Sequence, residues 1–233
     1  MANYHVIIPA AGTGSRMKQS IPKQFASLEG KTILQWVESI FSNVLAIKSI
    51  SIAIQPSEKF LEISGCQFSD KTEVLKTGGE SRAQTVLNTV KKIQNLVSED
   101  DWILVHDAAR VGITESVINN FITNIGSDKV GGIMAMRVAD TVKRVNDNVE
   151  IIKTEDREKL WLAQTPQMFR YKILKKALEQ FDGYPTDEAE AIESLGLRPK
   201  IFEGSILNNK ITYQEDLVNA NKVIELMNKS NLS

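Results

Sequence analysis

Apolar residues along this chain form short runs that alternate with segments of helical periodicity. The runs at 4–8, 102–105 and 131–136 are typical of strands that are buried on both faces of a parallel sheet. Between them, as at 33–44 and 117–125, apolar residues recur every three or four positions, which predicts amphipathic helices. Further strands are predicted at 49–54, 73–76 and 200–202, and further helices at 86–97, 173–181 and 186–196. Strands that alternate with helices predict βαβ units and an α/β fold with a mostly parallel sheet.

The segment 138–153 departs from this alternation. Apolar and polar residues alternate on both sides of Asn146-Asp147-Asn148, which predicts a β-hairpin. In a doubly wound fold such a hairpin usually serves as an arm for a partner or as a lid, and we place the arm at about 138–156. Further on, Thr212 with Glu215 three residues later predicts a capping box that starts the last helix. Because no repeat, low-complexity segment or linker is recognisable, we expect a single domain over 1–233.

The composition is that of an ordinary globular protein. Of 233 residues, 42% are hydrophobic and 24% are charged, and the formal net charge is -1. A charge this close to neutral argues against a surface for nucleic acid or an acidic membrane that covers the whole molecule, and it leaves local patches open. The single cysteine, Cys66, cannot form an intramolecular disulfide, which fits a reducing compartment. Because neither a signal peptide nor an apolar run of bilayer length is recognisable, we expect a cytoplasmic protein without a membrane partner.

Three groups of small or polar residues directly follow predicted strands. They are the loop that starts at Pro9, the Gly78-Gly79 turn, and Asp107-Ala108-Ala109-Arg110. In open α/β sheets, ligands bind at the carboxyl ends of the strands. The three groups therefore predict one ligand site at that edge of the sheet, although a Gly-Gly pair is more often simply a turn.

The first of these loops suits an anion. Gly12 and Gly14 let backbone N–H groups approach a phosphate closely, and Arg16 and Lys23 supply positive charge. A dinucleotide fingerprint is not present, because Met17 occupies the position of its third glycine, and no Gly-Lys-Ser/Thr sequence completes a P-loop. The loop favours a polyphosphate; the alternative is a tight turn that carries solvated cations.

The residues near Asp107 leave several roles open. Asp107 is either a turn or capping residue, or it binds a divalent ion or the hydroxyls of a polyol, and Arg110 beside it could hold a phosphate. His106 is expected to be packed at the end of a strand rather than to act as a base. Lys210 is either a plain surface lysine or an active-site residue.

An ordered series of motifs makes the chain resemble a known family. The motifs are PAAGTGSRM (9–17) with PKQ (22–24), GGESR (78–82) with Thr85, VHDAAR (105–110), DTVK (140–143), Arg157, Leu160-Trp161, TPQ (165–167), TDEA (186–189), and NKIT (209–212) with Glu215-Asp216. In this order they resemble the 2-C-methyl-D-erythritol 4-phosphate cytidylyltransferases of the non-mevalonate isoprenoid pathway. The resemblance spans essentially the whole chain, although the first motif is shared with many sugar-nucleotide transferases.

The resemblance implies a fold, a reaction and a set of site residues. The fold would be a Rossmann-like, mostly parallel twisted sheet of the nucleotidyltransferase type, with helices on both faces and a protruding β-arm. The reaction would be a magnesium-dependent transfer of the cytidylyl group of CTP to 2-C-methyl-D-erythritol 4-phosphate, with release of pyrophosphate; the protein ligands of the metal stay unknown. By the same resemblance, the catalytic residues are Arg16, Lys23, Arg157 and Lys210, the nucleotide-binding residues are Ala10, Ala11, Gly12, Gly14, Gly79, Glu80, Thr85 and Ala108, and the substrate-binding residues are Asp107, Arg110, Thr141 and Thr165.

The family's arm reaches into a neighbouring subunit, so the resemblance also implies a homodimer in which Thr141 and Arg157 serve the partner's site. The chain departs from the family pattern at Val111 and Tyr213-Gln214, where proline is usual, and at Thr85, where serine is common. Three other functions remain open: a cytidylyltransferase for another polyol phosphate such as ribitol 5-phosphate, a regulatory nucleotide-binding module without turnover, and a nicotinamide-dependent oxidoreductase.

Overall fold

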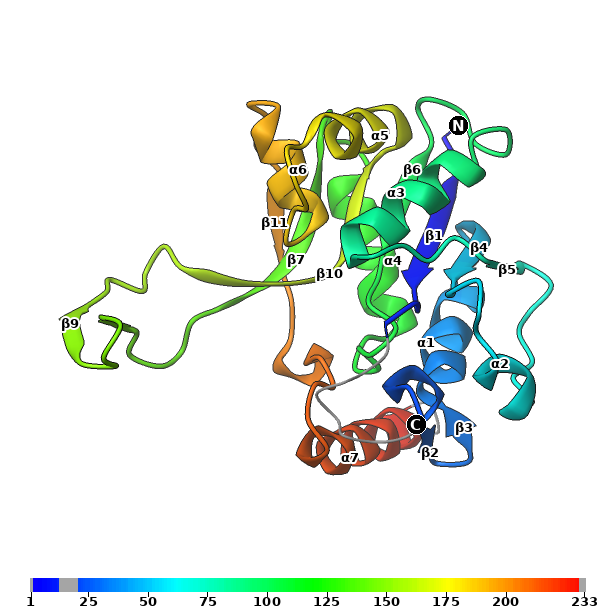
Figure 1. Ribbon diagram of the computed structural model, residues 1–233, viewed down its shortest axis with the longest axis horizontal. Helices are drawn as coiled ribbons and strands as arrows, with labels where there is room; N and C mark the ends of the chain where they lie inside the picture. The colour runs from blue at the N-terminus through cyan, green and yellow to red at the C-terminus, as the bar shows by residue number, and fades with distance from the viewer. Residues whose placement is uncertain (1, 13–20, 231–233) are drawn as a thin grey trace.

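The computed structural model describes residues 2–12 and 21–230. Within these residues a seven-stranded sheet has the strand order β11-β7-β10-β6-β1-β4-β5 (Figure 1). In that order the strands are β11 (Lys200–Glu203), β7 (Gly131–Arg137), β10 (Trp161–Arg170), β6 (Trp102–Val105), β1 (Tyr4–Pro9), β4 (Ile47–Ala53) and β5 (Thr72–Leu75). All of them run in one direction except β10, which is antiparallel to both of its neighbours. The mostly parallel α/β sheet predicted from the sequence is therefore confirmed.

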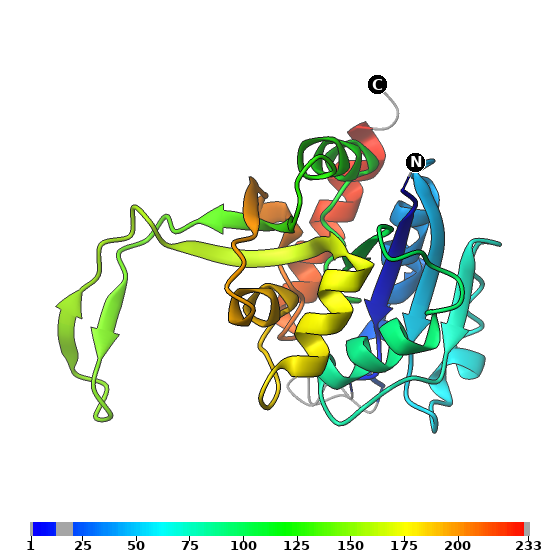
Figure 2. The same ribbon diagram turned by 90° about the horizontal axis from the view of Figure 1, so that it is seen from above.

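Helices cover both faces of this sheet (Figure 2). One face carries α1 (Ile33–Ser42), α4 (Glu115–Ile125) and α7 (Glu215–Ser230), and the other carries α3 (Arg82–Lys92), α5 (Tyr171–Gln180) and α6 (Glu188–Ser194). Val6 and Ile8 pack into the first core and Ile7 into the second. The strand is apolar throughout because successive side chains point to opposite faces and both faces are covered. Among the helices of the described residues, none is both long enough and apolar enough to pass through a membrane.

The strand β10 is the main element that the sequence pattern did not predict. Its sequence Gln164-Thr165-Pro166-Gln167 interrupts the apolar pattern with polar residues and a proline. The side chains of Gln164, Thr165 and Gln167 are nevertheless buried, and each makes a hydrogen bond. Polar residues that are satisfied in this way can occupy a core strand, but their periodicity does not reveal it.

Helix boundaries and short elements also differ from expectation. The capping box expected at Thr212 and Glu215 is wrong: α7 begins at Glu215, and the Asp216 carboxylate accepts the backbone N–H groups of Thr212 and Tyr213. Helix α3 ends at Lys92, short of the predicted end at 97. The short elements that were not predicted are β2 (Ser27–Leu28), β3 (Lys31–Thr32), α2 (Phe60–Ile63) and the 3-10 turns Lys23–Phe25 and Ile206–Asn208.

The predicted hairpin forms an arm that projects from the body of the molecule (Figures 1 and 2). Its strands β8 (Lys143–Val145) and β9 (Ile151–Thr154) pair antiparallel with each other in a sheet of their own. Its large apolar side chains face outward, with exposed fractions of 45% at Val145, 79% at Val149 and 65% at Ile151. The hairpin expected within 138–156 is therefore confirmed.

Candidate active site

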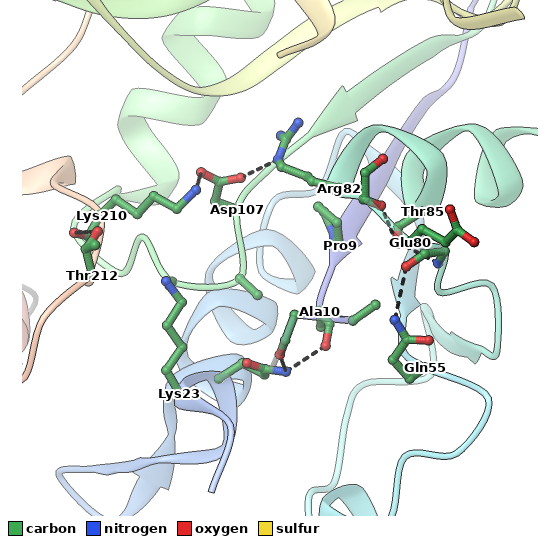
Figure 3. A pocket seen from close by; sticks show the side chains of 17 residues that line it. Pro9, Ala10, Lys23, Gln55, Glu80, Arg82, Thr85, Asp107, Lys210 and Thr212 are labelled. Atoms are coloured by element: carbon green, nitrogen blue, oxygen red, sulfur yellow. Dashed lines mark hydrogen bonds and ion pairs between the residues drawn. The ribbon is translucent and has the colours of Figure 1, made fainter. Parts of the chain in front are cut away.

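A cavity of about 400 Å³ lies at the carboxyl ends of β1, β5 and β6. This is the edge at which the sequence predicted a ligand site. The cavity is lined by Pro9, Ala10, Ala11, Gly12, Lys23, Gln24, Gln55, Gly79, Glu80, Ser81, Arg82, Thr85, Asp107, Ala108, Ala109, Lys210 and Thr212. Figure 3 shows Lys210, Asp107 and Arg82 in a row along one side of it.

One buried side chain binds the start of the loop after β1. The Gln24 amide, which is 3% exposed, donates hydrogen bonds to the carbonyl oxygens of Ala10 at 2.7 Å and Gly12 at 2.9 Å. These contacts fix the positions of two backbone carbonyls in the loop. Gly14 and Arg16, which the resemblance places in the same loop, lie outside the described residues.

The Gly78-Gly79 turn forms a second wall of the cavity. The Gly79 N–H donates to Thr85 Oγ1 at 3.0 Å, and the Gln55 amide donates to the Gly79 carbonyl at 3.1 Å. A Cβ at Gly78 would lie 2.8 Å from the Gln55 backbone and 2.9 Å from Ala11, so only glycine lets these loops approach one another. The Ser81 hydroxyl then caps α3 by accepting the Gln84 N–H.

Asp107 stands at the centre of the charged side of the cavity. Among the described residues, three cations contact its carboxylate: Arg82 Nε at 2.8 Å from Oδ1, and Lys210 Nζ at 2.9 Å and Arg110 Nε at 3.4 Å from Oδ2. Burial by itself raises the pKa of this carboxyl. The charges of Arg82, Lys210 and Arg110 outweigh the burial and hold the pKa of Asp107 well below its usual range. Asp107 is therefore an anion at any physiological pH.

Arg82 extends this cluster to a second carboxylate. Its Nη1 and Nη2 donate to Oε1 and Oε2 of Glu188 at 2.7 Å and 3.0 Å, which is a bidentate ion pair. Glu188 is the first residue of α6 and is 1% exposed. The sequence motifs include both residues, but no pattern of spacing indicated that they would meet.

Buried residues behind Asp107 fix its backbone. The Thr165 hydroxyl accepts the Asp107 N–H at 3.0 Å and lies 3.1 Å from His106 Nδ1, while His106 Nε2 lies 3.0 Å from the Arg110 carbonyl. The carbonyl can only accept, so His106 is assigned a proton on Nε2, and the Thr165 hydroxyl donates to Nδ1. Burial lowers the pKa of His106 to about 4. His106 is thus a neutral, packed residue, as expected.

The segment before α7 brings Lys210 to the cavity. Arg110 Nη1 donates to the Asn208 carbonyl at 2.7 Å, and Lys23 Nζ donates to the Ile211 carbonyl at 2.8 Å. The backbone of Ile211 in turn donates to the Ala109 carbonyl at 2.8 Å. Contacts on both sides of Lys210 therefore hold it against Asp107.

The structure brings most of the residues expected at the site together, but not all of them. Ten of them line the cavity: Ala10, Ala11, Gly12, Lys23, Gly79, Glu80, Thr85, Asp107, Ala108 and Lys210. Arg110 and Thr165 contact Asp107 from behind the cavity wall. Thr141 and Arg157 are exposed on and beside the arm, apart from this cavity. Gln24, Gln55, Arg82 and Glu188 had no predicted role. The motifs PKQ, GGESR and TDEA contain Gln24, Arg82 and Glu188 and could have drawn attention to them, whereas no motif contains Gln55.

An open α/β sheet with two glycine-containing loops and a cation-lined cavity at its carboxyl edge is an arrangement that suits a phosphorylated ligand such as a nucleotide. Residues 4–226 match the family model of 2-C-methyl-D-erythritol 4-phosphate cytidylyltransferase. The chain belongs to this family of cytidylyltransferases.

Individual relatives agree with the family match. The chain is 40% identical to the 2-C-methyl-D-erythritol 4-phosphate cytidylyltransferase of Nitrosomonas eutropha over 220 residues, which cover 93% of this chain and 94% of the relative. Among solved structures, a 4-diphosphocytidyl-2C-methyl-D-erythritol synthase superposes with a TM-score of 0.84 at 36% identity, covering 96% of this chain and 99% of the other. The Francisella tularensis cytidylyltransferase superposes with a TM-score of 0.80 at 37% identity, covering 95% and 100%.

Proposed function

We propose that this chain transfers the cytidylyl group of CTP to 2-C-methyl-D-erythritol 4-phosphate, forming CDP-methylerythritol and pyrophosphate. The observation that carries the proposal is the cavity itself, in which backbone loops for a nucleotide face a row of cations centred on Asp107. The family match supports this acceptor. It does not favour ribitol 5-phosphate or another polyol phosphate.

The reaction needs positioning and positive charge rather than a base. An oxygen of the acceptor phosphate attacks the α-phosphorus of CTP in line, and a new P–O bond forms. The bond from that phosphorus to the bridging β-oxygen breaks, and pyrophosphate leaves with the electron pair. The nucleophile is already an anion, so no proton has to be removed. A neutral, buried His106 is consistent with such a site.

The roles of individual residues are assigned from the family resemblance, and the positions of the described cations agree with them. Lys23 Nζ stands at the cavity wall beside the Ile211 carbonyl, and we assign it, with Arg16, to the charge that builds on the α-phosphate and the leaving group. Lys210 and Arg157 orient the attacking phosphate. Asp107 accepts hydrogen bonds from the polyol hydroxyls, supported by Arg110, Thr165 and the arm's Thr141.

The nucleotide contacts come mainly from backbone. We assign the backbone groups of Ala10, Ala11, Gly12 and Gly14 to the base and phosphates of CTP, Ala108 to the same nucleotide, and Gly79, Glu80 and Thr85 to the cytosine. A wall that satisfies the amino and carbonyl groups of cytosine leaves buried polar groups unpaired when uracil binds, which excludes UTP.

We expect a divalent cation, Mg²⁺, to accompany CTP. Among the described residues, no three His, Cys, Asp or Glu side chains are grouped to hold a metal ion, and both oxygens of Asp107 already accept from cations. This donor set fits an ion carried by the triphosphate rather than by a protein cage. Bound to the phosphates, Mg²⁺ neutralises charge on the departing pyrophosphate. Chelation should abolish turnover, and added Mg²⁺ should restore it.

The arm suggests a homodimer. Its outward apolar side chains, which include Val145, Val149 and Ile151, have no cover within the described chain, and a second copy is the partner that the family resemblance implies. In that dimer Thr141 and Arg157 would complete the partner's site. Light scattering should give the mass of two chains.

A complementation experiment tests the shared site. Co-expressed Lys23→Ala and Arg157→Ala subunits form mixed dimers. If Arg157 acts on the partner, one site of each mixed dimer is intact and activity returns. If Arg157 acts within its own chain, both sites carry a lesion and no activity returns.

The reaction itself is tested by incubating the pure protein with CTP, Mg²⁺ and each polyol phosphate, and measuring pyrophosphate. Turnover with 2-C-methyl-D-erythritol 4-phosphate and little with ribitol 5-phosphate is expected; no turnover with the former refutes the proposal. A cytoplasmic location is part of the proposal, because the substrates are soluble metabolites and the single cysteine suits a reducing compartment.

A further inference from the structure

Arg82 joins two carboxylates that come from different parts of the fold. Its Nε donates to Asp107 at the end of β6, and its Nη1 and Nη2 donate to Glu188 at the start of α6. A guanidinium has five N–H donors in a rigid plane, and these contacts use three of them. The position of one carboxylate therefore constrains the other.

Glu188 is a rigid anchor. It is 1% exposed, and both of its oxygens accept from one guanidinium. Two hydrogen bonds hold the first turn of α6, which carries Glu188. Asp187 caps the helix by accepting the Glu190 N–H at 2.9 Å, and Gln167 of β10 accepts the Ala189 N–H at 2.9 Å. Gln167 also donates to Asp187 at 2.8 Å.

We propose that Glu188 and Arg82 are positioning residues. They set the orientation of the Asp107 carboxylate toward the hydroxyls of the acceptor substrate, the polyol phosphate. The inference rests on the proposed function, which assigns Asp107 to that substrate. Asp107 Oδ1 is held by Arg82, and Oδ2 by Lys210 and Arg110. Rotation of an aspartate carboxylate about its last bond is broad unless hydrogen bonds restrict it. Without the anchored guanidinium, the carboxylate turns toward Lys210 and Arg110.

The nucleotide half of the cavity has supports of its own. Gly79 is held by Thr85 and Gln55, and the Ser81 hydroxyl caps α3. These bonds do not pass through Glu188. Loss of the Glu188 carboxylate should therefore raise the KM for the acceptor and leave the KM for CTP nearly unchanged. A general destabilisation of the fold would raise both.

The test compares Glu188→Gln with Glu193→Gln. Both changes neutralise a glutamate on α6, but Glu193 is exposed. Glu188→Gln places an amide N–H against the guanidinium, so one end of the ion pair becomes repulsive. We expect the KM for the acceptor to rise about tenfold and the KM for CTP to change less than about twofold, because small displacements of positioning groups are costly. Glu193→Gln should match the wild type.

A double-mutant cycle separates positioning from two independent lesions. Arg82→Lys keeps a charge but cannot reach both carboxylates, and it should raise the acceptor KM in the same way. If both residues act through one contact, the double variant Arg82→Lys/Glu188→Gln has an acceptor KM no higher than that of the more impaired single variant. If the two changes act independently, their effects on the acceptor KM multiply. Multiplicative effects would overturn the proposal.

The remaining outcomes are also decisive. An acceptor KM for Glu188→Gln equal to that of Glu193→Gln, or equal rises for acceptor and CTP, overturns the inference. If Glu188→Gln melts below the assay temperature, the same ratios are measured on Glu188→Asp, which keeps the charge but shortens the reach. Absence of wild-type turnover refutes the proposed function instead, so the two failures are distinguishable.

Discussion

Replacing Asp107 by asparagine removes the charge on which three cations converge. In Asp107→Asn, Arg82 and Lys210 lose a partner at 2.8 Å and 2.9 Å, and Arg110 loses one at 3.4 Å. Removing one member of a buried ion pair typically costs about 3–5 kcal/mol. Because the side chains of Lys210 and Arg82 are 34% and 27% exposed, water screens part of the effect, and we expect a loss of about 2–4 kcal/mol in the free energy of unfolding.

Scanning calorimetry measures this loss directly. For a chain of this size, each kcal/mol shifts the melting temperature by roughly 2–4 °C, so Asp107→Asn should melt roughly 4–16 °C below the wild type. Asp182→Asn, at an exposed aspartate, is the matched control. A melting temperature within about 2 °C of that control would refute the reasoning, since it would mean that the three cations are stabilised equally well without the carboxylate.

The pH dependence gives an independent check. The pKa of Asp107 is lower in the folded protein than in the unfolded chain, because the surrounding cations outweigh its burial. Its contribution to stability is therefore present above the unfolded pKa of about 3.9 and is lost as the pH falls through the folded pKa. The difference between wild type and Asp107→Asn should stay constant from about pH 5 to 8 and narrow only in stronger acid. A difference that widens on acidification contradicts this account.

Two further substitutions test other residues of the cavity, and a third tests the packing of Gly112 against Leu207. Gln24→Glu replaces the amide that donates to two loop carbonyls with a carboxylate that cannot donate, so the KM for CTP should rise about tenfold in steady-state assays. An unchanged KM for CTP would show that the loop does not depend on the Gln24 amide. Lys210→Ala should lower kcat/KM about 100-fold with an unaltered circular dichroism spectrum, and activity within a few-fold of wild type would remove Lys210 from the mechanism. In Gly112→Ala the new Cβ would lie 1.7 Å from the Leu207 carbonyl oxygen, so the free energy of unfolding should fall by about 2 kcal/mol or more. An unchanged melting temperature would show that the backbone at Leu207 moves aside without cost.

The fold was predictable where local sequence and burial agree. Strands such as β1 and β6 are buried on both faces, so an apolar run identifies them. The strand β10 was missed because Thr165 and Gln167 are polar and buried, and their partners are remote in sequence. The pattern of apolar and polar residues does not show which polar side chains are buried and hydrogen-bonded, so it could not predict this strand.

The site shows the same division. Glycine-containing loops and Asp107 were recognisable because each motif is continuous in the chain. Arg82 and Glu188 are separated by 106 positions, and only the fold brings them together. The role of Arg16, which lies outside the described residues, and the single domain over 1–233 stay predictions.

The strand β10 belongs to two parts of the molecule at once. At the base of the arm, Trp161–Ala163 pairs with one stretch of β7, and 167–169, which also pairs with β6, pairs with another. The ladder shifts between them, and Thr165, which holds the Asp107 backbone, lies inside this irregular stretch. In an unbroken strand, adding or removing one residue would turn every later side chain to the opposite face. Here β10 advances four positions, from Ala163 to Gln167, where β7 advances two, so the pairing at the base of the arm does not fix the pairing of the segment that follows Thr165.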